Sequence, residues 1–219
     1  MRREQVRARI EEIGVIPAVR VSSDEDALFA AEAIAFGGIP IVEIPMTVPK
    51  ALDVISKIAR GGQQIIVGAG TLFDVESARQ CLDAGAQFLT TTGLDLKIVE
   101  LAVNEDVVVF PGALTPTEII TAWKAGADLV KVFPCSQVGS ASYIRALKSP
   151  FPQIPLIASG GVNQQTAADF ILAGASALGI GKSLIPRQAI HLRQAHWIHE
   201  LARRYVSMVK DAREQKAAR

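Results

Sequence analysis

The sequence has few cysteines, almost no net charge and no long apolar run, and each absence excludes a class of protein. Two cysteines in 219 residues cannot form a disulfide framework, and they lack CxxC spacing, so we expect a reduced, cytoplasmic setting. The 23 Lys and Arg residues balance 22 Asp and Glu residues, so we expect neither a nucleic-acid nor a membrane partner. Residues 1–14 alternate charges with Val6 and Ile10, which predicts a short amphipathic helix and no signal peptide or membrane span.

What the sequence does contain is a repeated alternation of short apolar runs with helical stretches. Hydrophobic residues make up 49% of the chain, enough for a sizeable core. The apolar runs begin near Val15, Pro40, Ile65, Phe88, Val107, Leu129, Pro155 and Ala177. Their spacing of about 19 to 26 residues fits one strand, one helix and two turns.

This repetition predicts an α/β fold, a (β/α)8 TIM barrel. We expect residues 1–219 to form a single domain, with an N-terminal helix, the barrel at about 13–186 and a C-terminal helical extension at about 187–219. Ser23, Thr115 and Asn163 stand where helix N-caps are expected. An open doubly wound sheet is the alternative fold.

Three segments resemble cofactor or metal sites, but each lacks a residue that such a site requires. The GAGTLF segment has Phe73 where a dinucleotide fingerprint needs glycine, and GIGKS has Ser176 where a P-loop needs its first glycine. The three histidines, His191, His196 and His199, fall in the predicted tail helix without a third ligand near the last two. We therefore expect no bound nucleotide and no metal.

Charged and hydroxylated residues collect at the carboxyl ends of the predicted strands, where barrel enzymes place their active sites. Side-chain alternation in DLVKVFP and IPIVEIP directs Lys131 and Glu43 into the barrel, and Arg20 and Thr71 follow strands one and three. A neutral lysine amine attacks carbonyl carbons, and a nearby carboxylate can move protons on the carbon next to an imine. A buried ion pair that merely fills the barrel is the alternative.

A second cluster follows the last two predicted strands. ASGGV supplies Ser159, Gly160 and Gly161, and GIGKS supplies Lys182 and Ser183. Backbone N–H groups in glycine turns at helix N-termini bind anions, and barrel phosphate sites often lie at this place. The cluster predicts a phosphorylated substrate, unless the glycines serve only to permit tight turns.

The motifs IPAVR, GGIPIVEI, VGAGT, FPGALTPTE, LVKVFP, ASGGV and GIGKSLIP occur in one order between about residues 14 and 186. In this the chain resembles the aldolases of 2-keto-3-deoxy-6-phosphogluconate (KDPG), including bifunctional forms that also cleave 4-hydroxy-2-oxoglutarate (KHG). The resemblance implies that Lys131 is the Schiff-base lysine, Glu43 the proton shuttle and Thr71 a ligand of the pyruvyl carboxylate. It also implies that Ser159 sets stereochemistry at the new carbinol. The substrate and phosphate positions that it implies are Arg20, Phe133, Gly160, Gly161 and Ser183.

The chain departs from the family pattern in two places. Thr47 stands where many members carry an arginine that holds the pyruvyl carboxylate, although another branch has Thr-Val-Pro here as well. Thr91 and Thr92 replace a common Ser-Pro near the pyruvyl methyl. We count Thr47 and Thr92 among the substrate-binding positions and expect changes in substrate affinity and donor selectivity.

The resemblance implies a class I aldolase, a lyase that cleaves KDPG to pyruvate and glyceraldehyde 3-phosphate, and that could also cleave KHG to pyruvate and glyoxylate. It implies a homotrimer acting on a small phosphorylated keto acid through a covalent imine with Lys131, without a cofactor. Cleavage of the C4 epimer, 2-keto-3-deoxy-6-phosphogalactonate, is an alternative, as is a barrel that binds a phosphorylated sugar acid without cleaving it. An isomerase would need a second acid or base, which the sequence does not indicate.

Overall fold

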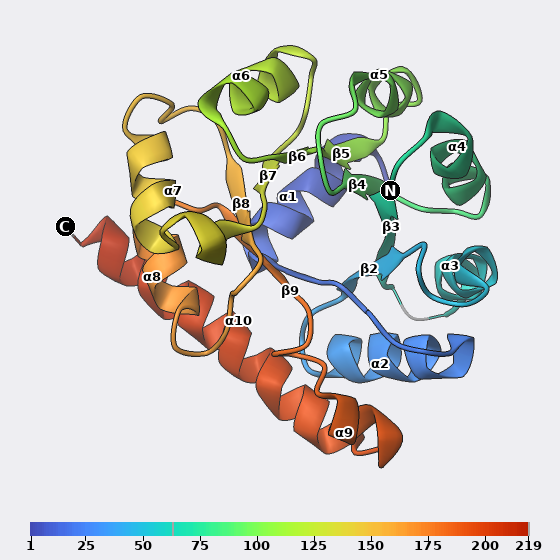
Figure 1. Ribbon diagram of the computed structural model, residues 1–219. Coiled ribbons are helices and arrows are strands. Elements are labelled where there is room, and N and C mark those ends of the chain that lie inside the picture. Colours follow the sequence, from blue (N-terminus) through green and yellow to red (C-terminus); the bar gives the residue numbers. More distant parts are fainter. Residues whose placement is uncertain (63, 219) are drawn as a thin grey trace.

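The computed structural model describes residues 1–62 and 64–218. Short parallel strands form a central ring, and helices surround it (Figure 1). The strands are β1 (Val15–Pro17), β2 (Ile41–Pro45), β3 (Ile66–Leu72), β4 (Phe88–Thr91), β5 (Val108–Phe110), β6 (Gly112–Ala113), β7 (Val130–Val132), β8 (Leu156–Ser159) and β9 (Ala177–Ile180). The surrounding helices are α2 (Asp24–Phe36), α3 (Ala51–Arg60), α4 (Val75–Asp83), α5 (Leu96–Asn104), α6 (Pro116–Lys124), α7 (Ala141–Lys148) and α8 (Ala167–Leu172). The apolar runs of the sequence predict the strand positions well.

Two connections join the strands into a closed ring. Hydrogen bonding defines a sheet in the order β1-β9-β8-β7-β6 and another in the order β2-β3-β4-β5. Only Pro111 separates β5 from β6, so one stretch of chain pairs with β4 through its first half and with β7 through its second. At the other seam Ala18 forms a bridge with Glu43, and the Val19 N–H donates to the Glu43 carbonyl at 2.9 Å. The predicted TIM barrel is thereby confirmed, and the open sheet is not.

Helix N-termini follow the predicted capping residues in two of three cases. The Ser23 hydroxyl accepts from the Asp26 N–H at 3.1 Å at the start of α2. Thr115 and Glu118 form a capping box at the start of α6. The prediction for Asn163 is wrong, because its side chain accepts N–H groups within the turn at 163–166, and α8 begins only at Ala167.

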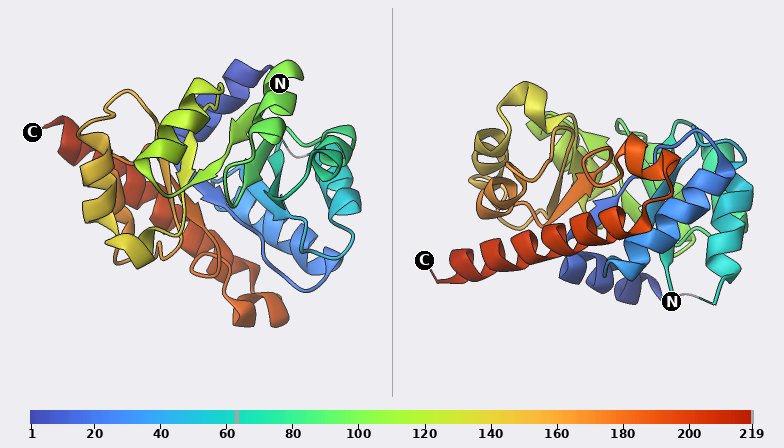
Figure 2. Two further views of the ribbon diagram at one scale, coloured as in Figure 1. Left: turned by 45° about the horizontal axis from the view of Figure 1, so that its top comes forward. Right: turned by 90° about the horizontal axis from the view of Figure 1, so that it is seen from below.

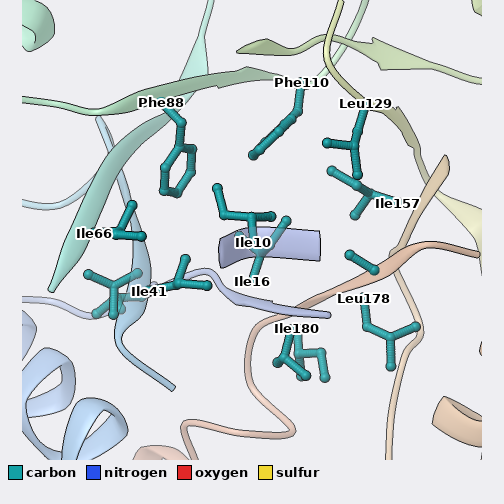
Figure 3. Packing of buried hydrophobic residues seen from close by; sticks show 14 of the residues in the cluster. Ile10, Ile16, Ile41, Ile66, Phe88, Phe110, Leu129, Ile157, Leu178 and Ile180 are labelled. Atoms are coloured by element: carbon teal, nitrogen blue, oxygen red, sulfur yellow. The ribbon is translucent and has the colours of Figure 1, made fainter. Parts of the chain in front are cut away.

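Apolar side chains from the strands converge on the barrel axis and fill its amino-terminal half (Figure 3). They include Ile16, Ile41, Ile66, Phe88, Phe110, Leu129, Ile157 and Leu178. Ile10 of the N-terminal helix α1 (Arg3–Ile13) lies among them and is fully buried. The Arg3 guanidinium contacts the buried carboxylate of Asp128 at 2.9 Å. The predicted amphipathic helix therefore closes the end of the barrel opposite to the carboxyl ends of the strands.

The C-terminal extension consists of two helices where the sequence pattern predicts one. Helix α9 (Arg187–His191) ends before α10 (Ala195–Ala217), so His191 is separated from the other two histidines. Leu192 falls in the break and is 51% exposed, whereas Leu201 and Tyr205 of α10 are buried. Figure 2 shows α10 as a long rod along one side of the barrel, where it packs against α8 and α2. No helix in the described part of the chain has both the length and the apolar character needed to cross a membrane.

Candidate active site

Lys131 and Glu43 meet inside the barrel, as side-chain alternation predicts. Lys131 lies on β7 and Glu43 on β2, and the Lys131 Nζ is 3.5 Å from the Glu43 Oε2. Both side chains are more than nine-tenths buried. Each follows an apolar residue of the barrel core by two positions, Leu129 and Ile41 respectively, so the pair lies one layer closer to the carboxyl ends of the strands.

Two glycines of β3, Gly68 and Gly70, leave space for the side chains of Phe88 and Glu43. A Cβ added at Gly70 would lie 2.2 Å from the Glu43 Oε1, so the carboxylate occupies the space that a side chain at 70 would fill. A Cβ at Gly68 would lie 2.3 Å from the Phe88 ring. The VGAGT motif therefore explains how a carboxylate and a phenyl ring fit into the same narrow barrel. The Glu43 Oε1 has no hydrogen-bond partner within the described residues.

A cavity of about 560 Å³ opens above the ion pair. Glu43 and Lys131 line it together with other polar and apolar side chains and with glycine turns. The full lining is Ala18, Arg20, Glu43, Lys131, Phe133, Ser159, Gly160, Gly161, Val162, Asn163, Gly179, Gly181, Lys182, Ser183 and Ile185. The cavity brings together the predicted lysine and acid, and two further cations, Arg20 and Lys182. Its size suits a small ligand.

One wall of the cavity consists of the turns after β8 and β9. Gly160 and Gly161 have φ angles of 84° and 88°, a left-handed conformation that side chains rarely adopt. Their N–H groups donate to no group in the part of the chain that the structure describes, and they remain free for a ligand. Gly179 of β9 has no Cβ, and one built there would lie 2.7 Å from the Ser159 hydroxyl. This wall can bind an anion, with Lys182 and Ser183 beside it.

This geometry agrees with a match to known proteins. The model of the KDPG and KHG aldolase family matches residues 6–201. The chain belongs to this family. It is an aldolase, and aldolases of this kind are lyases. The resemblance in its motifs is thereby confirmed.

Individual relatives extend the match. The 2-dehydro-3-deoxy-phosphogluconate aldolase of Treponema pallidum is 32% identical over 182 residues, which cover 83% of this chain and 86% of that protein. The 2-dehydro-3-deoxy-6-phosphogalactonate aldolase of Escherichia coli is 32% identical over 202 residues, covering 91% and 95%. A structure of KDPG aldolase from Legionella pneumophila, with pyruvate captured as a covalent carbinolamine intermediate, superposes with a TM-score of 0.84 at 26% identity and covers 91% and 97%.

Three predicted substrate-binding residues of this aldolase lie outside the cavity lining given above. Thr47 is exposed in the turn after β2, and Thr92 is half-buried after β4. Thr71 lies within β3, although the sequence pattern places it just past that strand, and it has a φ of 59°. The register between β3 and β4 shifts between Ala69 and Leu72, so simple alternation does not hold there. The binding roles of these three threonines stay predictions.

Two polar residues of this site, Thr90 and Asn163, were not predicted as site residues from the sequence. Thr90, on β4, accepts a hydrogen bond from the Lys131 Nζ at 3.2 Å and is 1% exposed. It follows Phe88 by two positions, so the alternation that identified Lys131 also points to it. Asn163, predicted only as a helix cap, lines the cavity. No group of three or more potential metal ligands occurs among residues 1–62 and 64–218.

Proposed function

We propose that this aldolase cleaves KDPG to pyruvate and glyceraldehyde 3-phosphate, with Lys131 as the Schiff-base lysine and Glu43 as the group that moves protons. The observation that carries the proposal is the contact of the Lys131 Nζ with the Glu43 carboxylate at 3.5 Å, on the floor of the cavity. Burial keeps bulk water away from both groups. The Legionella relative, captured with pyruvate as a carbinolamine, supports the same chemistry here.

The reaction begins with the neutral Lys131 amine. It adds to the C2 ketone to give a carbinolamine, which takes up one proton and loses water to become an iminium ion. Glu43, through a water molecule, then accepts the proton of the C4 hydroxyl while the C3–C4 bond breaks and its electron pair moves into the enamine. Glyceraldehyde 3-phosphate leaves, Glu43 returns a proton to C3, and hydrolysis releases pyruvate. The iminium is the electron sink, so this sequence of steps needs no metal or organic cofactor.

The glycine turns support a phosphorylated substrate. The Gly160 and Gly161 N–H groups, the Ser183 hydroxyl and the Lys182 ammonium can surround a phosphate at the cavity wall formed by the turns after β8 and β9. KHG has no phosphate, so its cleavage to pyruvate and glyoxylate would use the lysine and the acid without this wall. Ser183→Ala should therefore raise KM for KDPG by about 5-fold, the scale of one hydrogen bond, and leave KM for KHG nearly unchanged.

Cleavage of the C4 epimer is a second candidate, because the phosphogalactonate aldolase of E. coli is as similar to this chain as the T. pallidum enzyme. Ser159 lines the cavity and is 8% exposed. We propose that its hydroxyl contacts the carbinol at C4. The kcat/KM values for the two epimers, measured with coupled pyruvate detection, identify the preferred substrate, and Ser159→Val should bring them closer.

The central test is chemical trapping of the imine. The enzyme is treated with pyruvate and borohydride, and the adduct is located by peptide mass mapping. We expect one adduct on Lys131 that Lys131→Ala abolishes. Lys182→Ala is the matched control, because Lys182 lines the same cavity and its removal should leave the Lys131 adduct in place. No adduct, or an adduct on Lys182, would end the assignment.

We also propose the homotrimer that the family resemblance implies, and sedimentation equilibrium at several concentrations tests it. A monomer at all concentrations would refute it. The single-domain organisation and the cytoplasmic location stay predictions.

A further inference from the structure

Thr90 is a second polar partner of the reacting nitrogen. Its Oγ1 is 3.2 Å from the Lys131 Nζ, closer than the Glu43 Oε2 at 3.5 Å. Thr90 is 1% exposed and is not among the residues that line the cavity, and its one hydrogen-bond partner in the described structure is the Lys131 Nζ. Any effect of Thr90 on the reaction therefore acts through its hydrogen bond with the Lys131 nitrogen.

The Thr90 hydroxyl differs from that of its neighbour Thr91, which forms hydrogen bonds with backbone groups. Thr91, equally buried, donates to the Gly93 carbonyl and accepts from the Gly112 N–H at 3.0 Å, so it ties two chain segments together. The Thr90 hydroxyl makes no such bond in the described part of the structure, and its one partner there is the Lys131 Nζ. A valine would fill the same volume without the cost of burying a hydroxyl.

The number of N–H groups on the nitrogen changes during the reaction that we propose. A lysine ammonium has three N–H donors, whereas the iminium formed after loss of water has one. If that single N–H binds Glu43, the carboxylate is held by the positive charge and becomes a weaker base. If it binds a neutral hydroxyl, the carboxylate is free to move protons at carbon.

We infer that the Thr90 hydroxyl accepts the N–H of the Lys131 iminium and so releases Glu43 for proton transfer. This inference rests on the proposed function, because it requires an imine at Lys131. It assigns Thr90 to the proton-transfer stage, and it leaves formation of the imine largely intact. The contact also explains why a hydroxyl is present at a position where packing alone favours an apolar residue.

The test separates imine formation from proton transfer. Thr90→Val and Thr90→Ser enzymes are incubated with saturating pyruvate in D2O, and methyl deuteration is followed by NMR. In parallel, the imine fraction is measured by borohydride trapping at Lys131. We expect Thr90→Val to trap pyruvate but to exchange methyl protons about 10-fold more slowly per trapped imine, on the scale of one hydrogen bond to a charged group. Thr90→Ser should restore most of the exchange.

Thr121→Val is the control, since it removes a hydroxyl on α6 that donates to the Thr117 carbonyl at 2.7 Å and lies outside the cavity lining. It should leave exchange per trapped imine unchanged. Wild-type exchange per imine in Thr90→Val would overturn the inference, and so would failure of Thr90→Ser to restore it. Absence of trapping in the wild-type enzyme would instead refute the proposed function, so the two failures are distinct.

Discussion

Gly70→Ala tests whether the position of the Glu43 carboxylate controls proton transfer. The added methyl group would lie 2.2 Å from Oε1, 2.4 Å from Cδ and 2.6 Å from Cγ of Glu43, where ordinary contacts begin at 3.4 Å. Gly70 pairs with Pro45 at the last position of the β2–β3 ladder, and its carbonyl accepts the Met46 N–H at 2.9 Å, so the backbone is held and the carboxylate must shift by about 1 Å or more. A displacement of about 1 Å at a reacting group can cost about 10²-fold in rate.

We therefore expect Gly70→Ala to slow methyl-proton exchange of pyruvate by about 10²-fold while trapping at Lys131 persists. The overpacking should lower the free energy of unfolding by about 1 to 3 kcal/mol, measured by urea denaturation. Gly62→Ala is the control, because a Cβ there meets nothing within 4 Å. Gly68→Ala should cost similar stability, since its methyl would meet the Phe88 ring, but should slow exchange less. Exchange at the wild-type rate in folded Gly70→Ala would refute the role of Glu43.

Three further predictions concern stability and reactivity. A hydrogen bond from the backbone N–H of Thr115 is the main cause that lowers the pKa of Glu118. The contribution of Glu118 to stability is therefore present above the ordinary glutamate pKa of about 4.3 and is lost as the pH falls through the lower pKa of the folded state. In urea titrations, Glu118→Ala should lower the free energy of unfolding by about 1 kcal/mol at pH 7 and by less near pH 3, and an equal loss at both pH values would contradict this. Burial raises the pKa of Tyr205, and the Ser183 side chain near its hydroxyl offsets part of that rise, although no hydrogen bond of full geometry reaches the hydroxyl in the described structure. Tyr205→Phe should therefore change the unfolding free energy by less than about 1 kcal/mol, and a larger loss would show that Ser183 is a full hydrogen-bond partner. Burial raises the pKa of Cys81 to about 12 and that of Cys135 to about 11. Neither thiol should therefore react with a disulfide reagent at pH 8 until the protein is denatured. Rapid labelling of the native enzyme would refute this.

Much of the fold follows from the sequence because its signals are local. A parallel barrel strand is a short apolar run between turns, and alternation along such a run determines which side chains enter the barrel. That reasoning brought Lys131 and Glu43 together across 88 residues of chain. It applies equally to Thr90, two positions after Phe88, but a single threonine in an apolar strand does not by itself indicate a functional role.

The errors arise where the backbone departs from regular geometry. The irregular register of β3 makes alternation unreliable at Thr71. Helical periodicity runs through the tail, yet the chain breaks after His191, and the Arg193 residue in the break has a φ of 50°. Asn163 illustrates a third case, because a residue suited to capping a helix is equally suited to capping a turn before it. Sequence spacing alone does not distinguish these outcomes.

The geometry of the ion pair bears on whether Lys131 and Glu43 merely fill the barrel. A buried ion pair contributes to stability only when its geometry is good and its remaining polar atoms are satisfied, and apolar residues of similar volume often do as well or better. Here the Nζ to Oε2 distance is 3.5 Å, longer than the 2.7 to 2.9 Å of a strong charge-assisted hydrogen bond, and the second carboxylate oxygen has no partner in the described structure. A pair selected to close the barrel would bind both oxygens and leave no cavity above them. The loose contact, the unpartnered Oε1 and the open space beside it instead favour a carboxylate and an amine kept available for a ligand.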